Sequence, residues 1–436
     1  MMRFTKAYGA IARLIGATVV AGCGGQAAHI VPTAAHRRDA GASIPLARAV
    51  YPAFPDVTAD GTRGFDTAWV AHQSVFETHL ERGASAWAPI ANLGAVKGQA
   101  QATIDVAPTG AAVIAWTPTN AEASTTVEMR YRRTFDGPWG PLTQMTDRRG
   151  LSAVRVATDA RGEAYVAWRS ASGITLATHP SNAARGWQSP RVVIRDRGAI
   201  PSQPGRALAL ATSPSGELAV AWEDQVKGGM TTVSRSLIHL RVRSRAGQWS
   251  SPTYLGAETS PPMQGDTQPQ SPVLGATFGS NSRIFVTWQA ATRQGISPRI
   301  ASLSASGGWG RPRELTVPRA GQYPVIAADD RNLATVLWTT SNGTIQSATL
   351  SPSGSLSKLQ TLGSGGQPTV VADGAGRFAA VWNGQAAYRT PHGWCPRREF
   401  GEVSESSVAM AADGQAEIVL NRHNTLSSLR LIACSD

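Results

Sequence analysis

The sequence predicts an all-β protein, a β-propeller built from eight four-stranded blades. Three observations predict this fold. A strand–turn–strand unit recurs in one register along the chain, its second strand is apolar on both faces, and a Trp followed by a Pro recurs after it. The clearest copy of the unit runs from Val156 to Trp168. In its turn, Gly162 supplies a positive φ at no steric cost, and Asp159 is able to bond its own backbone.

The register is defined by a turn residue that is followed six positions later by Trp. The eight matching pairs are Arg63/Trp69, Gly110/Trp116, Gly162/Trp168, Gly216/Trp222, Ser282/Trp288, Asn332/Trp338, Gly376/Trp382 and, with Leu in place of Trp, Gly414/Leu420. The repeat averages about 45 residues, which is the length of a propeller blade. We therefore predict eight blades, with seven as the alternative if one degenerate end unit forms no blade.

The strand that ends in the anchor Trp is predicted to lie inside the blade. The residue two positions before the anchor is β-branched in seven of the eight units, and the residues between are mostly apolar. A strand that is apolar on both faces is buried on both faces, as it is between two neighbouring blades.

A second Trp follows in six units, with a Pro two or three residues later, as in Trp87 and Pro89. Because Pro donates no ladder hydrogen bond, we expect this segment to be the outer strand. All 13 Trp residues are interpreted as packing residues.

The amino end predicts export. Residues 1–22 hold a basic start and a short apolar run, Leu14 to Ala21, which is too short to span a bilayer. The run ends in Val20-Ala21-Gly22-Cys23, which resembles a bacterial lipobox. The resemblance implies cleavage before Cys23 and acylation (palmitate) of its thiol, so that the protein is a lipoprotein of the cell membrane or cell surface. Residues 23–42 are predicted to be a flexible tether, and residues 43–436 to be the propeller.

The ring is predicted to close through its two chain ends. The last unit has no Trp–Pro strand, whereas residues 43–50 resemble one, so the amino-terminal strand is expected to complete the carboxy-terminal blade. Of the three Cys residues, Cys395 and Cys434 remain after Cys23 is set aside. In an oxidising compartment they are predicted to form a disulfide that fixes the carboxy terminus, with two buried free thiols as the alternative.

The repeat resembles bacterial extracytoplasmic propellers of the sialidase-like kind, which carry an Asp box. The resemblance rests on the architecture and on Thr158-Asp159-Ala160-Arg161-Gly162, although Trp168 follows further along than in that box. It implies a propeller with either a carbohydrate-directed enzymatic site or a binding site. The Arg, Tyr and Asp arrangement of a sialidase site has no clear counterpart here.

The candidate ligand site is a polar ring at the mouth of the central channel. Long loops in the middle of the chain should emerge on one face of the propeller, where function tends to be carried. The residues expected there enter the inner strands or directly follow the inner Trp. They are Arg155, Arg169, Gln203, Arg206, Glu223, Asp224, Gln270, Gln289, Gln322, Gln367 and Asn383. The alternative is that they only cap strands and hold channel water.

Several chemistries lack a signature. The chain has no phosphate loop, no metal-ligand spacing among its eight His residues and no cofactor motif. The formal charge is +12, of which residues 1–22 carry three positive charges and no negative one, leaving +9. Nucleic acid is not an expected partner of an exported chain, whereas acidic glycans and anionic lipids are. The sequence therefore favours a non-enzymatic binding or scaffold module for a protein or glycan partner in the cell envelope. The alternative is a carbohydrate-active enzyme, a sialidase-like hydrolase or a lyase.

Overall fold

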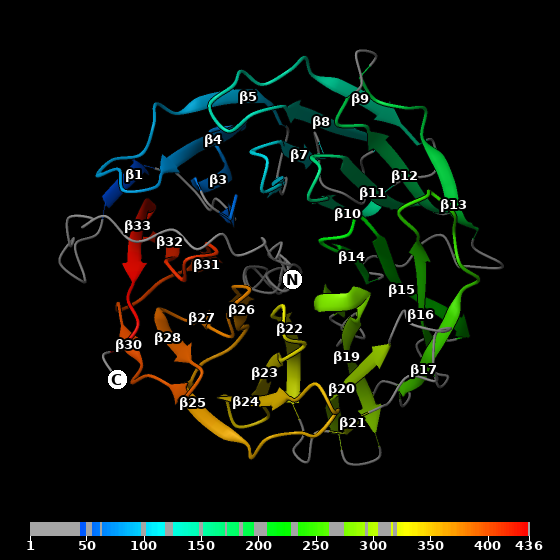
Figure 1. The fold of residues 1–436 in the computed structure, drawn as a ribbon, viewed down its shortest axis with the longest axis vertical. Helices are drawn as coiled ribbons and strands as arrows, with labels where there is room; N and C mark the ends of the chain where they lie inside the picture. The colour runs from blue at the N-terminus through cyan, green and yellow to red at the C-terminus, as the bar shows by residue number, and fades with distance from the viewer. Residues whose placement is uncertain are drawn as a thin grey trace, which may run out of the picture.

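The computed structural model describes residues 44–48, 55–61, 63–96, 102–117, 125–147, 151–170, 172–182, 186–195, 207–227, 234–260, 274–292, 295–303, 315–316 and 321–434. The predicted signal segment, tether and acylation site at Cys23 lie outside these residues. The described strands form eight sheets arranged as a ring, which confirms the eight-bladed propeller (Figure 1). No helix in the described ranges is long and apolar enough to cross a membrane.

Within each blade, neighbouring strands are antiparallel, and the order of the strands goes from the central axis to the rim. The first four blades are β2 (Asp56–Ala59), β3 (Gly64–Ala71), β4 (Ser74–Glu81) and β5 (Ala91–Ala95); β6 (Ala102–Val106), β7 (Ala112–Trp116), β8 (Thr126–Arg132) and β9 (Thr143–Thr146); β10 (Leu151–Thr158), β11 (Ala164–Ser170), β12 (Gly173–His179) and β13 (Arg191–Arg195); and β14 (Leu208–Thr212), β15 (Leu218–Lys227), β16 (Ser234–Arg243) and β17 (Thr253–Ser260).

The remaining blades follow the same order, with one 3-10 turn at Ser280–Ser282. They are β18 (Leu274–Phe278), β19 (Ile284–Thr292), β20 (Gly295–Leu303) and β21 (Leu315–Thr316); β22 (Gly321–Ala328), β23 (Ala334–Thr340), β24 (Thr344–Leu350) and β25 (Gln360–Ser364); β26 (Thr369–Ala372), β27 (Phe378–Trp382), β28 (Gln385–Thr390), β29 (Gly393–Trp394) and β30 (Arg398–Glu399); and β31 (Glu405–Met410), β32 (Ala416–Arg422), β33 (Thr425–Leu431) and β1 (Ile44–Arg48).

Both predicted closures are confirmed. Strand β1 pairs antiparallel with β33 and supplies the outer strand of blade 8, so the first and last strands of the described chain share one sheet (Figure 1). Cys395 and Cys434 form a disulfide with their Cα atoms 5.6 Å apart. The bond ties the end of the chain to blade 7, next to the closing blade.

The anchor Trp residues hold neighbouring blades together. All seven lie on the second strand of their blades and are at most 2% exposed. At three junctions the indole reaches a glycine in the outer strand of the preceding blade. A Cβ atom added at Gly94 would lie 2.8 Å from Cζ2 of Trp116, one at Gly256 3.1 Å from Trp288, and one at Gly363 3.2 Å from Trp382. The glycine is therefore needed for the close approach of the ring.

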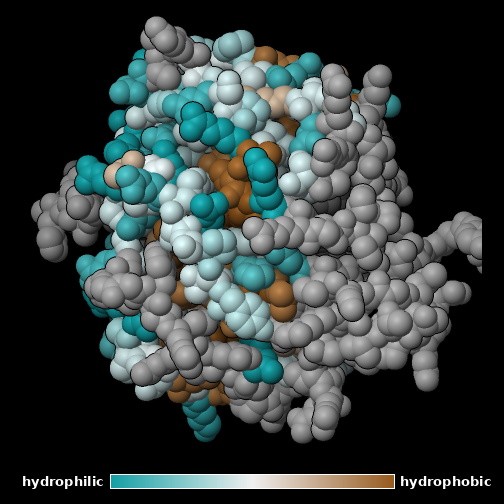
Figure 2. Space-filling model, turned by 90° about the vertical axis from the view of Figure 1, so that its right-hand side faces the viewer, coloured by the Kyte–Doolittle hydropathy of each residue, from teal (hydrophilic) through white to brown (hydrophobic). Residues whose placement is uncertain are grey.

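In blades 1 to 4 the second Trp and its Pro lie in the connection before the outer strand rather than in the strand itself, whereas Trp394 of blade 7 lies on β29. Trp87 and Pro89, for example, precede β5, which begins at Ala91. The Trp87 indole donates to Ser428 Oγ of blade 8 at 2.8 Å, so the ring packs across the blade junction. The outer strands then form the wall of the propeller, part of which Figure 2 shows as hydrophilic surface with apolar areas.

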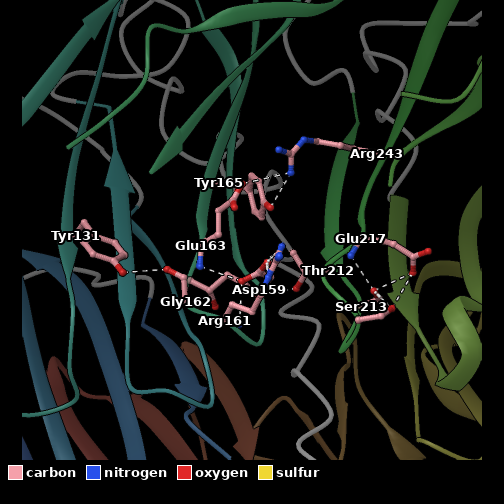
Figure 3. A network of polar contacts seen from close by, with 12 residues as sticks. Tyr131, Asp159, Arg161, Gly162, Glu163, Tyr165, Thr212, Ser213, Glu217 and Arg243 are labelled. Atoms are coloured by element: carbon pink, nitrogen blue, oxygen red, sulfur yellow. Dashed lines mark hydrogen bonds and ion pairs between the residues drawn. The ribbon is translucent and has the colours of Figure 1, made fainter. Parts of the chain in front are cut away.

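The Asp-to-Gly turns are joints between blades, as Figure 3 shows for blades 2 to 4. Asp159 Oδ1 accepts the N–H groups of Arg161 and Glu163, both at 2.9 Å, and closes its own turn. The carbonyl of Gly162 accepts the Tyr131 hydroxyl of blade 2 at 2.9 Å. On the other side, a Cβ atom at Gly216 of blade 4 would lie 2.8 Å from Nη2 of Arg161. These turns line one face of the ring, which we call the turn face; the opposite face is the loop face.

Candidate binding site between blades 3 and 4

Each of blades 1 to 7 presents a row of side chains from the anchor Trp outward, set by the pairing of its second, third and outer strands. In blade 4 the row is Trp222, His239 and Tyr254. The corresponding third-strand and outer-strand residues differ between blades. They are Phe76 and Asn92, Glu128 and Gln144, Thr175 and Val192, Arg299 and Thr316, Gln346 and Thr361, and Gln385 and Glu399. The residue types in these rows thus differ from blade to blade, while the strand pairing that positions them stays the same.

The blade 4 row forms an aromatic stack. The rings of Trp222 and His239 are stacked with centroids 5.2 Å apart, and those of His239 and Tyr254 are 5.8 Å apart and tilted by 60°. Trp222 is buried against blade 3, whereas Tyr254 is 47% exposed at the rim. The stack therefore leads from the core of the blade junction to solvent.

A carboxylate lies at the edge of this stack, next to the ring nitrogens of Trp222 and His239. Asp224 Oδ1 accepts a hydrogen bond from Arg169 Nη2 of blade 3 at 3.2 Å, and its Oδ2 accepts one from Trp222 Nε1 at 3.0 Å. His239 Nε2 is 3.7 Å from the same Oδ2. The Asp224 side chain is 32% exposed, while the Arg169 side chain is 1% exposed and also donates to the Glu223 carbonyl at 2.5 Å. Arg169 and Asp224 thus form an ion pair across the two blades, with the anion at the surface.

Burial lowers the pKa of His239, and the charge of Asp224 opposes that shift. The imidazole is accordingly neutral at pH 7 and presents one donor and one acceptor. We name Arg169, Trp222, Asp224, His239 and Tyr254 the Tyr254 shelf. It offers an aromatic face, a partly free carboxylate and a neutral imidazole, which are groups that orient a polar ligand.

Of the other candidate residues, Glu223 is beside the shelf but faces away from it. It is adjacent to Asp224 on β15, so the two side chains point to opposite faces of blade 4. Gln289 is buried and its Oε1 accepts the Tyr323 N–H at 3.2 Å, which links blades 5 and 6.

The remaining described candidates are spread around the ring. Gln322 is half-buried at the start of β22, and Gln367 is exposed before β26. Asn383 is exposed in the turn between β27 and β28. Among the described candidates, Arg169 contacts the Asp224 side chain and the Glu223 carbonyl, while Gln203, Arg206 and Gln270 lie outside the described residues.

Arg155 lies on the innermost strand β10, away from the shelf, in a region with two buried carboxyl groups. Asp56 Oδ2 accepts the Ile104 N–H at 3.0 Å, and Asp105 Oδ2 accepts the Thr158 N–H at 2.6 Å. Each Asp thus ties the inner strand of one blade to that of the next. Burial raises the pKa of Asp56 to about 7, with Arg155 opposing the shift, and raises that of Asp105 to about 6. These carboxyl groups hold the inner ring together.

Sequence reasoning missed His239 and Tyr254. The available signal was the strand register, because both residues fall on the row of an anchor Trp once the strands are paired. Within the described residues, no three His, Cys, Asp or Glu side chains are grouped as a metal site would require.

No protein-family model matches the chain, and no curated protein matches it. Among solved structures, the chain is similar to the Dos1 propeller, with a TM-score of 0.54, 8% identity and coverage of 88% of this chain and 94% of that one. It is also similar to an ulvan lyase of polysaccharide lyase family PL25, with a TM-score of 0.50, 8% identity and coverage of 89% and 94%. The lectin BP39L from Burkholderia pseudomallei matches at a TM-score of 0.49 and 16% identity, covering 84% and 95%. At these identities the similarity shows the fold, so the chain is a β-propeller, and its activity has to be argued from its own residues.

Proposed function

We propose that this protein is an exported, lipid-anchored propeller that acts as a non-enzymatic binding module for a glycan in the cell envelope. The observation that carries the proposal is the Tyr254 shelf, where the exposed ring of Tyr254 and the partly exposed carboxylate of Asp224 both lie next to His239 on a rigid junction. The ring face suits the apolar face of a sugar, and the carboxylate suits its hydroxyl groups.

The hydrogen-bond capacity of Asp224 supports a binding role. A carboxylate has about four acceptor sites. Two donors on Asp224, from Arg169 and Trp222, are internal to the protein, and the exposed part of the side chain leaves room for ligand hydroxyl groups. Because Arg169 and Trp222 are fixed by burial, the acceptor is held in place before the ligand arrives.

A binding role fits the shelf better than hydrolysis. A glycosidase uses two carboxyl groups that flank the scissile bond. Asp224 is the carboxylate of the shelf, and neighbouring Glu223 points to the opposite face of blade 4. The enzyme alternative keeps one specific observation, the neutral His239 at 3.7 Å from Asp224, which is the arrangement of a general base beside an anion.

Export and anchoring rest on Leu14 to Cys23. A multiply acylated Cys23 would hold the protein stably on a membrane. Residues 23–42 would then space the ring from the bilayer.

The test is a panel of neutral and acidic glycans presented to the protein starting at Gly24, which retains every described strand of the closed ring. Binding and released sugar are recorded together. We expect binding without release, weakened about fivefold or more by Tyr254→Ala and by Asp224→Asn. Thr361→Ala, at the Tyr254 position of blade 6, is the matched control and should bind normally. Released sugar that depends on His239 would establish the enzyme instead, and no binding to any glycan would favour a protein partner.

A further inference from the structure

The exposed large apolar side chains follow a pattern around the wall of the propeller. Ile90, Leu142, Val192 and Tyr254 are 37–47% exposed and make up four of the five such side chains in the described residues. Each lies at or just before the start of the outer strand in one of four consecutive blades, one or two residues after the Pro. In Figure 1 these strands, β5, β9, β13 and β17, follow one arc of the rim.

The fold does not require apolar residues at this position. In blade 7 the residues after Pro396 are Arg397, Arg398 and Glu399, and Arg397 and Glu399 are exposed. Blade 7 nevertheless forms the same sheet. Among the described residues, exposed apolar side chains at this position are therefore found on blades 1 to 4.

Positive charge accompanies the apolar residues at blade 3. Arg191 and Arg195 lie at the two ends of β13, on either side of Val192, and both are exposed. Neither guanidinium has a partner among the described residues. Figure 2, which faces the side of the ring with β13 and β17, shows apolar surface bordered by hydrophilic side chains. We define Leu142, Val192, Arg191 and Arg195 as the basic rim.

The size and shape of the basic rim indicate a bilayer surface rather than a second copy of the chain. The two apolar side chains of the basic rim, Leu142 and Val192, are 37% and 45% exposed, so their apolar area is small beside the roughly 800 Å² that each partner of a stable protein interface buries. A flat surface touches a convex wall over about two neighbouring blades, and Leu142 and Val192 belong to such a pair. Shallow apolar insertion with guanidinium groups at the headgroups is the usual chemistry of peripheral attachment to anionic lipid.

We infer that the basic rim of blades 2 and 3 rests on the headgroup layer of an anionic membrane. This orientation places the axis of the ring along the bilayer plane. Tyr254 lies at the end of the arc, on blade 4, so it remains accessible to a ligand of the Tyr254 shelf. The inference is separate from acylation, because it concerns the wall of the ring.

The experiment measures co-sedimentation of the unacylated chain starting at Gly24 with phosphatidylcholine vesicles, with and without phosphatidylglycerol. We expect binding only to the anionic vesicles, weakening as salt rises. Arg191→Gln with Arg195→Gln should lower the partition coefficient roughly tenfold to thirtyfold. Leu142→Ser with Val192→Ser should lower it severalfold at unchanged charge.

The matched control is Arg397→Gln with Arg398→Gln, which removes the same charge from blade 7, outside the apolar arc. It should bind like the unsubstituted chain. An equal loss in this control would show unspecific attraction and overturn the inference, as would the absence of vesicle binding or binding that ignores Leu142 and Val192. Circular dichroism of each variant verifies the fold.

Discussion

At the scale of single residues, buried polar groups in this propeller act across blade junctions. Asp56 and Asp105 bond backbone N–H groups of the next blade, and the anchor Trp residues approach glycines of the preceding one. Packing was predicted for the Trp residues from the sequence, whereas no role was predicted for the two Asp residues. Their partners show that they stabilise the ring.

The two Asp residues predict a stability that falls as pH rises. Their folded pKa values, about 7 and about 6, lie above the unfolded value of about 3.9. The folded state therefore retains protons that the unfolded state releases, so stability is greatest below about pH 4 and is lost as pH rises through 6 to 7. Asp56→Asn keeps an acceptor for Ile104 and removes one titration. It should flatten the decline of Tm between pH 4 and 7 by roughly 5 °C. If Tm falls with pH as steeply in this variant as in the unsubstituted protein, the raised pKa of Asp56 is refuted.

The close approach of Trp116 to Gly94 predicts a steric effect. Gly94→Ala puts a methyl group 2.8 Å from the indole, so it should destabilise the protein by about 1–3 kcal/mol. Gly366→Ala is the control, because a Cβ atom there meets nothing within 4 Å. Denaturant unfolding of both variants checks the difference. Equal stability of the two would mean that the ring moves aside without cost.

At the scale of elements, most of the blade could be predicted from the chain, because a strand buried on both faces leaves a strong pattern. The turn at Asp159 is where the register puts it, and the strand predicted from Ala164 to Trp168 is β11, which continues to Ser170. The outer strand was harder to place. Trp87 and Pro89 were predicted to lie in the outer strand, but they lie in the connection before β5. The indole packs on blade 8 instead, and this contact could not be inferred from the sequence.

The site could be predicted only in part for a similar reason. Arg169 and Asp224 directly or nearly follow anchor Trp residues, so their place near the loop-side ends of the strands could be inferred. Their ion pair, and the approach of His239 and Tyr254, depend on which third and outer strand residues share a row. That pairing depends on bulges such as the one between Ile238 and His239, and a one-residue shift changes the face of every side chain.

At the scale of the whole molecule, the closed ring leaves no unpaired end blade. β1 completes blade 8, and the disulfide holds the carboxy terminus on blade 7. Because the ring is closed, the Tyr254 shelf and the basic rim belong to one rigid body, and the two surfaces face different directions.

The disulfide is expected to stabilise this closure. Cys434→Ser should lower the stability by about 3–4 kcal/mol in the chain-entropy model for a loop of 39 residues. Thermal melting under non-reducing conditions measures the loss, and the unsubstituted protein after reduction should melt like the variant. Identical melting with and without the bond would show that β1 and β33 close the ring unaided.

The most direct test of the central claim is a crystal structure of the chain starting at Gly24 with the glycan that binds it best. The account predicts a sugar ring against Tyr254, with a hydroxyl group in hydrogen-bond contact with Asp224 and no displacement of Arg169. A glycan bound at another blade junction, or in the central channel near Arg155, with the Tyr254 shelf empty, would contradict it.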